Sequence, residues 1–351
     1  MMRFALGLLA TVFFIGCGSS GSGPDRNDTP PPDINITDPF FAYEWHLRPA
    51  DADFASRYGI ANTSHVHLGD AWRKTRGRGV TVAVIDDYFQ ADHPDIAANV
   101  VATYNVKTGG TDVFPPGKAK AHGLMCAGII AAAADGQGSV GVAPEVKLML
   151  IGSAYDTDAD MIKAFTYAKE HGADVINCSW GSYHVSKAVS DVIKDVHDAG
   201  ITVVFAAGND AVDLDSPGYD DESELPWVIG VSASDASNAL ASYANRGSAL
   251  DLLAPGGSRY GISIVSTDLT GLAGSSPKED PKAAEWLDDN HTFFVGTSAA
   301  APIVTGAAAL LKSAAPALTP DEIRRVLVEN GDDIGAFCDK LDITKAINAL
   351  Y

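Results

Sequence analysis

Ser298 is the residue whose position first suggests chemistry. It ends the short sequence Gly296-Thr297-Ser298, directly before an apolar helix predicted to run to Leu311. Serine is a favoured N-cap residue, so its hydroxyl could simply accept hydrogen bonds from the first turn of this helix. It becomes a nucleophile only where a base removes its proton. A catalytic role for Ser298 therefore depends on what the rest of the chain supplies.

Three further residues could complete such a site. His122 could act as the base, and Asp86 could hold the imidazole in the correct tautomer. The side-chain amide of Asn209 and the backbone N–H of Ser298 could stabilise an oxyanion, aided by the positive end of the helix. Taken singly, each of these residues has an ordinary structural explanation as a turn or core residue. Their combination predicts catalysis by a nucleophilic serine.

Apolar strands and helices alternate along the chain and would position these residues. Strands are predicted over residues 80–85, 146–151, 174–177, 201–206, 227–231 and 251–253, and helices over 122–134, 160–170, 186–199 and from 320 onward. This alternation predicts a parallel sheet with helices on both faces. Asp86, Ser179 and Asn209 follow predicted strands. They should therefore meet at the carboxyl edge of the sheet, where such folds bind ligands.

Composition limits the classes of function. The 351 residues are 46% hydrophobic and 20% charged, which is enough apolar material for one large globular domain or two small ones. The formal net charge of −20 repels phosphate and argues against nucleic acid as a partner.

The N-terminal residues predict export. Arg3 precedes an apolar segment, 4–15, that is too short to span a bilayer comfortably. The segment ends in Phe14-Ile15-Gly16-Cys17, which resembles the lipobox of bacterial lipoproteins. We expect residues 1–17 to be a lipoprotein-type signal peptide and residues 18–37 a flexible Gly/Ser/Pro-rich tether. The protein would then be anchored by lipid on the periplasmic or extracellular side of a membrane, or secreted if Cys17 is not lipidated.

The chain resembles the subtilisin-like serine proteases, the subtilases of peptidase family S8. The order Asp, His, Ser is the order of that family. Four segments carry its motifs: Val82 to Asp86, His122-Gly123 with Ala127-Gly128, Ala206 to Asn209, and Gly296 to Ser298 with Ala300 and Pro302. The resemblance extends from about Asp38 to the end, so it implies a single catalytic domain over 38–351.

The resemblance implies a function and a division of labour. It implies an α/β subtilisin-like doubly wound parallel sheet and a monomeric serine endopeptidase that acts through an acyl-enzyme. Asp86, His122 and Ser298 would be the triad, and Asn209 would form part of the oxyanion hole. The substrate, a protein or peptide, would be bound by Ser179, Trp180, Gly181, Ala207 and Gly208. The alternative is a pseudoprotease that binds extended peptides without cutting them.

The resemblance also suggests a structural calcium ion, although no cofactor is expected for the chemistry itself. Asp38, Asp95 and Asp135 match positions used for calcium in relatives, and the loop could add carbonyls of Ala133, Gln137 and Ser139. Alternatively, these are surface aspartates of a very acidic protein. The further acidic residues between 213 and 224 could favour basic substrates, but a solvated loop is the simpler interpretation.

Some residues depart from the family pattern. Asp87-Tyr88 replaces the usual Ser/Thr-Gly, so a second carboxylate could raise the pKa of Asp86 or alter its orientation. Met125 replaces a second histidine of the motif. Cys126 matches a free cysteine that some relatives carry under the catalytic histidine, which predicts inhibition by mercurials. With Cys178 and Cys338 it leaves at least one free thiol.

The segment between the lipobox and the catalytic domain is also shorter than in most secreted relatives. Residues 18–37 are too few to fold as a propeptide. We therefore expect maturation without a conventional propeptide.

Overall fold

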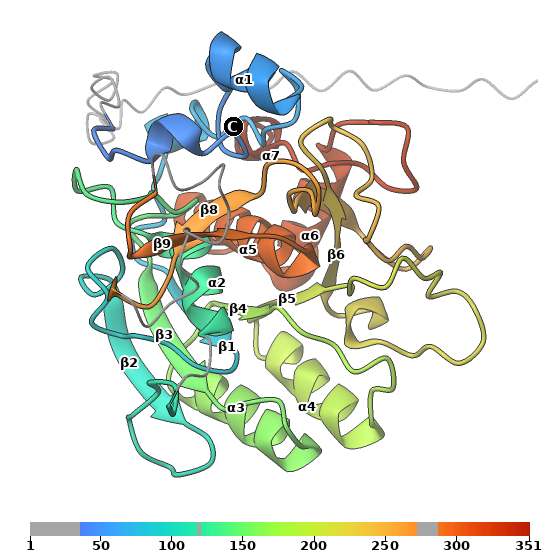
Figure 1. Cartoon of the computed structure of the whole chain (residues 1–351). Coiled ribbons are helices and arrows are strands. Elements are labelled where there is room, and N and C mark those ends of the chain that lie inside the picture. The colour runs from blue at the N-terminus through green and yellow to red at the C-terminus, as the bar shows by residue number, and fades with distance from the viewer. Residues whose placement is uncertain (1–35, 118–120, 272–286) are drawn as a thin grey trace, which may run out of the picture. The chain divides into compact units, whose positions relative to one another are not determined.

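The computed structural model describes residues 36–117, 121–271 and 287–351 (Figure 1). The predicted signal peptide and nearly all of the predicted tether lie outside the described residues. Within the described part, no helix is both long and apolar enough to cross a membrane.

A seven-stranded parallel sheet forms the centre of the fold, in the order β2-β3-β1-β4-β5-β6-β7. The strands are β1 (Thr81–Ile85), β2 (Val100–Asn105), β3 (Lys147–Gly152), β4 (Val175–Cys178), β5 (Thr202–Ala206), β6 (Ile229–Ser234) and β7 (Leu252–Pro255). A separate antiparallel pair joins β8 (Ile264–Thr267) to β9 (His291–Phe294). The doubly wound parallel sheet predicted from the sequence is confirmed.

Helices cover both faces of the sheet (Figure 1). On one side lie α2 (His122–Ala131), α5 (Thr297–Ala314), α6 (Pro320–Glu329) and α7 (Ile343–Asn348), and on the other lie α3 (Asp158–Glu170) and α4 (Lys187–Asp198). A further short helix, α1 (Ala52–Tyr58), precedes the sheet in the chain. Both faces of the sheet are therefore buried, which explains why the sequences of the strands are almost continuously apolar.

Strand β1 shows how the two faces are separated. Its side chains alternate, so Val82 and Val84 join the core beneath α2 and α5, while Ala83 and Ile85 join the core beneath α3 and α4. All four residues are fully buried.

The strand register brings the carboxyl ends of three strands into line. Ile85 of β1 pairs with Cys178 of β4, and Cys178 pairs with Phe205 of β5. The next residues, Asp86 and Ser179, consequently leave the sheet side by side. This register brings distant parts of the chain together at the carboxyl ends of these strands.

Several elements differ from the sequence prediction, which included none of β2, β8, β9 and α1. Strand β2 was not predicted, because it lies at the sheet edge and most of its residues are only half-buried, which weakens the apolar pattern. The helix predicted over residues 122–134 ends at Ala131. Its last carbonyls accept hydrogen bonds from the backbone N–H groups of Val142 and Ala143, so the chain turns away at Ala132.

Candidate active site

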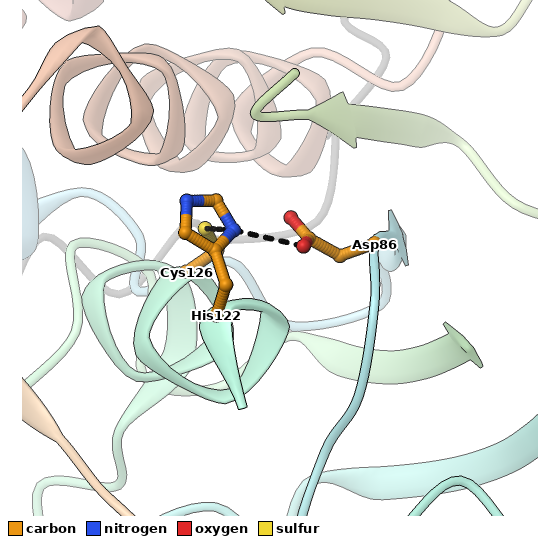
Figure 2. A group of neighbouring side chains, drawn as sticks. All are labelled: Asp86, His122 and Cys126. Carbon is orange, nitrogen blue, oxygen red and sulfur yellow. Dashed lines mark hydrogen bonds and ion pairs between the residues drawn. The ribbon is translucent and has the colours of Figure 1, made fainter. Parts of the chain in front are cut away.

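Asp86 and His122 are joined by a hydrogen bond. Asp86 directly follows β1 and is fully buried, and His122 is the first residue of α2. The Nδ1 of His122 lies 2.8 Å from Oδ1 of Asp86 (Figure 2). Burial alone would lower the pKa of His122, but the charge and hydrogen bond of Asp86, together with the contributions of Cys126, raise it well above 6.5. The pair therefore has the geometry of an imidazole held by a carboxylate through Nδ1.

Ser298 is the second residue of α5, and its surroundings fix the start of that helix. Pro302 has no N–H, so it cannot close a helical hydrogen bond to the Ser298 carbonyl. That carbonyl instead accepts a hydrogen bond from the hydroxyl of Ser179 at 3.1 Å. In return, the hydroxyl of Ser298 donates to the Ser179 carbonyl at 2.9 Å. Two reciprocal hydrogen bonds thus tie the serine turn to the end of β4.

Asn209 is oriented by the same turn. Its Oδ1 accepts a hydrogen bond from the backbone N–H of Thr297 at 2.8 Å. The NH₂ of the carboxamide is therefore directed elsewhere and can serve as a donor near Ser298. Gly296, with φ of 132°, makes this approach sterically feasible, because a Cβ at this position would lie 3.1 Å from Oδ1 of Asn209.

A cavity of about 340 Å³ opens beside Ser298. Among the residues predicted to bind substrate, Ser179, Trp180, Gly181 and Gly208 line it, whereas Ala207 is fully buried and its neighbour Ala206 lines the cavity instead. The indole of Trp180 donates to the Ile85 carbonyl at 2.7 Å, so this side chain is held against the end of β1.

Sequence reasoning did not place Tyr183, Asp210, Asp221 or Thr297 at this cavity, although all four line it. Asp210 and Thr297 could have been found, because each is adjacent in sequence to a residue already assigned to the site. Tyr183 had no such neighbour, and Asp221 was predicted only as part of the acidic segment 213–224, for which a solvated loop was the simpler interpretation.

Asp87 does not displace Asp86 from His122. One carboxylate oxygen of Asp87 accepts hydrogen bonds from the backbone N–H groups of Gly123, at 2.9 Å, and of Tyr88. Asp87 thus fastens the first turn of α2 rather than facing the imidazole. Burial, followed by the charge of Asp86, raises the pKa of Asp87 to about 6.

Cys126 lies beneath the imidazole, one helical turn after His122. Its Sγ is 3.9 Å from Nδ1 of His122 (Figure 2). The same Sγ lies 3.6 Å from the Ser298 carbonyl oxygen. Burial raises its pKa to about 11, so it is a neutral thiol near pH 7. Cys126, Cys178 and Cys338 are all free of disulfides.

We expect a mercurial to inhibit the protein by reacting with Cys126. A mercury atom on Sγ would intrude between the imidazole and the serine turn. Because the thiol is buried and protonated, labelling should be slow. The measurement is residual peptidase activity against the extent of labelling, with Cys126→Ala as the control that should resist the reagent. Full activity after stoichiometric labelling of Cys126 would contradict this prediction.

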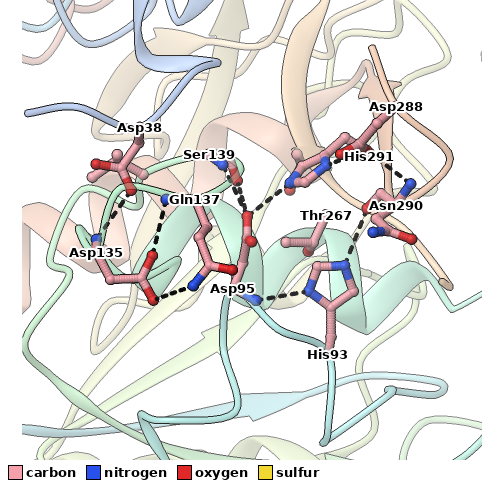
Figure 3. Close-up of polar contacts among 12 residues, drawn as sticks. Asp38, His93, Asp95, Asp135, Gln137, Ser139, Thr267, Asp288, Asn290 and His291 are labelled. Atoms are coloured by element: carbon pink, nitrogen blue, oxygen red, sulfur yellow. Dashed lines mark hydrogen bonds and ion pairs between the residues drawn. The ribbon is translucent and has the colours of Figure 1, made fainter.

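The three aspartates predicted to bind calcium make separate hydrogen bonds (Figure 3). Asp38 accepts from the backbone N–H groups of residues 135 and 136, each at 3.0 Å. The carboxylate of Asp135 accepts from the backbone N–H of Gln137 at 3.1 Å. Oδ2 of Asp95 accepts from Nε2 of His291 at 2.7 Å and from the backbone N–H and hydroxyl of Ser139.

This arrangement at Asp95 fits a buried ion pair rather than a calcium ligand. His291 lies between Asp95 and Asp288. Its Nε2 is 2.7 Å from Oδ2 of Asp95, and its Nδ1 is 2.7 Å from Oδ1 of Asp288. Burial opposes its protonation, but the two carboxylates raise the pKa of His291 to about 9. The pKa of Asp95 is lowered, because the hydrogen bond and charge of His291 outweigh burial. A protonated imidazole at this distance would repel a cation, so the three aspartates do not fit one calcium ion as they stand.

The ion pair predicts a loss of stability at alkaline pH. The pKa of His291 is higher in the folded state, about 9, than its ordinary value of 6.5. Its contribution is therefore complete below about pH 6.5 and is lost as pH rises through 9, with an upper limit of about 3 kcal/mol. The measurement is the free energy of unfolding in urea between pH 6 and pH 10.

His291→Gln is the comparison for that measurement. This substitution should remove most of the pH dependence of the free energy of unfolding between pH 6.5 and pH 9, while leaving that free energy at pH 10 nearly unchanged. The comparison is needed because Glu44, buried nearby with a pKa raised to about 8, also titrates in this range. Equal pH dependence in the wild-type and variant proteins would disprove the role of His291.

Fold and site together define the class of protein. A parallel sheet with helices on both faces, carrying aspartate, histidine and serine at one edge in that chain order, is a subtilisin-like α/β fold with a candidate serine-hydrolase site. The chain belongs to the subtilase family: residues 77–341 match Peptidase_S8, the subtilase family.

Individual relatives agree with this assignment. Fervidolysin of Fervidobacterium pennivorans is 31% identical over 75% of this chain and 38% of its own length. A calcium-dependent protease of Trichormus variabilis is 30% identical over 86% of this chain and 47% of its own length. The solved structure of a protease from Pseudoalteromonas arctica has a TM-score of 0.74 at 28% identity, covering 90% of this chain and 99% of that one. The chain thus spans less than half the length of these two sequence relatives.

Proposed function

We propose that this chain is a serine endopeptidase that cleaves peptide bonds through an acyl-enzyme. The observation that carries the proposal is the 2.8 Å hydrogen bond between Asp86 and His122, at the sheet edge that also carries Ser298 and Asn209. A buried carboxylate bound to Nδ1 fixes the tautomer in which Nε2 can accept a proton. Membership of the subtilase family supports the same function.

The proposed reaction has two halves. Oγ of Ser298 attacks the substrate carbonyl carbon while His122 takes the hydroxyl proton, and the new oxyanion is stabilised by Asn209 and the Ser298 N–H. The C–N bond then breaks, and His122 gives its proton to the leaving amine. In the second half, water attacks the ester under the same base and releases Ser298.

Before attack, the hydroxyl of Ser298 must change its partner. It donates to the Ser179 carbonyl, which belongs to the segment 179–181 expected to pair with the substrate. We propose that the hydroxyl rotates about χ1 toward His122 when a peptide binds along residues 179–181. Catalytic hydrogen bonds of unliganded enzymes are often formed only in the substrate complex.

A fluorophosphonate probe tests this proposal. The enzyme should be labelled at Ser298, and Ser298→Ala should abolish labelling while retaining the fold. Absence of labelling in well-folded protein would instead favour the pseudoprotease that only binds extended peptides. The motivation for that alternative is Asp87, which stands where the family usually has serine or threonine.

Calcium takes no part in the proposed reaction. The name of the Trichormus relative supports calcium binding as a proposal for this chain, whereas the ion pair at Asp95 opposes the site predicted from Asp38, Asp95 and Asp135. A chelator should therefore leave the thermal midpoint unchanged if His291 takes the place of the ion. A large drop in the thermal midpoint that added calcium reverses would instead support calcium binding at this site.

We further propose that the protein is exported and held on a membrane surface by lipid at Cys17. The apolar segment 4–15 and the sequence Gly16-Cys17 support this proposal. Metabolic labelling with a fatty-acid analogue tests it, and Cys17→Ser should abolish incorporation.

A further inference from the structure

The cavity beside Ser298 is lined by acidic side chains. Asp210 and Asp221 are among its eleven lining residues, and none of the eleven is lysine, arginine or histidine. The sequence alone favoured a solvated acidic loop here. The structure instead buries Asp221 to 1% exposure, inside the cavity that contains the candidate nucleophile and the oxyanion asparagine.

Asp221 is held in a fixed position. Its Oδ1 accepts two hydrogen bonds from Ser223, one from the backbone N–H at 3.0 Å and one from the hydroxyl at 2.6 Å. Its Oδ2 accepts from the backbone N–H of Tyr183 at 3.1 Å. These donors are neutral, so the carboxylate has no cationic partner among them. Burial raises its pKa, which indicates that its negative charge lacks full compensation.

Gly181 leaves this carboxylate accessible from the cavity. A Cβ at residue 181 would lie 2.6 Å from Oδ2 of Asp221, so any side chain there would cover the carboxylate. Gly181 also belongs to the segment expected to pair with the substrate backbone. A substrate side chain that enters beside it would therefore reach Asp221.

Asp210 adds a second negative charge at an exposed position of the lining. It accepts a hydrogen bond from the phenol of Tyr183, which also accepts one from Nδ2 of Asn245 at 3.0 Å. Tyr183 adopts φ of 60°, an uncommon conformation for a non-glycine residue, and these two partners hold its ring at the cavity. Arg259 contacts a lining residue, but it donates to the backbone carbonyl of Asn209 and does not itself line the cavity.

From this arrangement we infer that the cavity binds a basic side chain, arginine or lysine, at the substrate residue that precedes the scissile bond, and that Asp221 determines this specificity. The inference rests on the proposed endopeptidase function, because it names the substrate class of that same site. A guanidinium or ammonium group would compensate the charge of Asp221 and use the acceptor capacity that its oxygens retain. A neutral side chain of the same shape would leave the buried carboxylate unpaired.

Arginine and citrulline provide the matched test, since they have nearly the same shape but differ in charge. Two internally quenched peptides, identical except for arginine or citrulline before the scissile bond, are compared by kcat/KM. The wild-type enzyme should prefer arginine by roughly 10²-fold. A ratio near one would overturn the inference.

Variants locate the source of the preference. Asp221→Asn should reduce the preference to a few-fold while retaining cleavage of the citrulline peptide, and Asp210→Asn should reduce it less. Asp220→Asn is the control, because it removes an exposed charge from the same loop without lining the cavity. An arginine preference that survives Asp221→Asn would overturn the assignment to this residue. Since Asp221 also caps the short helix Glu222–Glu224, the ratio within each variant is the readout, together with its thermal midpoint.

Binding separates this inference from the proposed catalysis. Fluorescent versions of the two peptides are titrated into Ser298→Ala and followed by anisotropy. Tighter binding of the arginine peptide supports the inference even if the wild-type protein cuts neither peptide, in which case only the endopeptidase function fails. Equal binding of the two peptides overturns the inference whatever the wild-type protein cleaves.

Discussion

Replacing Ser298 by alanine is expected to lower peptidase turnover by roughly 10⁶-fold. The substitution removes the attacking oxygen but leaves the Asp86–His122 pair and the donor of Asn209 in place. Residual hydrolysis would therefore come only from binding and oxyanion stabilisation. The measurement is kcat with a saturating peptide substrate, on protein purified from a host that lacks background peptidases.

The fold should tolerate this change. The Ser298 side chain is half-buried, and its hydroxyl makes one hydrogen bond, to the Ser179 carbonyl. Ser313→Ala is a suitable control, because it removes a hydroxyl from the same helix that is hydrogen-bonded to the Arg78 carbonyl and the Thr75 hydroxyl. Ser313→Ala should retain activity within a few-fold. A Ser298→Ala protein that keeps more than a hundredth of the wild-type turnover would exclude Ser298 as the nucleophile.

Much of the candidate site could be predicted from the sequence because its residues follow apolar strands or begin helices. The strand pattern identified β1, β4 and β5, and parallel strands necessarily bring their carboxyl ends to one edge. The sequence alone therefore predicts that Asp86, Ser179 and Asn209 follow strands of the sheet, as the structure shows. The position of Ser298 followed from the start of α5.

Contacts between distant residues were not predictable in the same way. His291 and Asp95 are 196 residues apart, and no local pattern connects them. Calcium was predicted by resemblance at a place where an imidazole now holds the carboxylate. Asp95 was predicted only as a calcium ligand or a surface aspartate, because its actual partner depends on how β9 packs against the turn at Asp95.

Asp221 shows a different limit of sequence reasoning. An acidic residue in an acidic segment is normally solvated, and composition cannot reveal which one is buried. Asp221 is buried because it caps a short helix and accepts the backbone N–H of Tyr183. Both contacts depend on loop conformations, including the positive φ of Tyr183, that strand and helix periodicity does not encode.

Asn209→Ala is expected to lower kcat by roughly 10²–10³-fold, with little change in KM. Such a loss is typical where one oxyanion donor is removed, because the interaction is made in the transition state and not with the bound substrate. In this chain the expectation depends on the hydrogen bond from the Thr297 N–H to Oδ1, which directs the NH₂ of Asn209 away from the backbone.

Asn209→Asp sharpens the same argument. Aspartate can still accept the hydrogen bond of Thr297, so the turn before Ser298 should keep its conformation, but a second carboxylate oxygen would replace the donor. A negative charge beside the developing oxyanion should make this variant slower than Asn209→Ala. The measurement is kcat for both variants against one peptide, with fluorophosphonate labelling rates as a second readout. If Asn209→Asp were as active as the wild-type enzyme, the carboxamide could not be an oxyanion donor, and the oxyanion would have to be stabilised by backbone N–H groups alone.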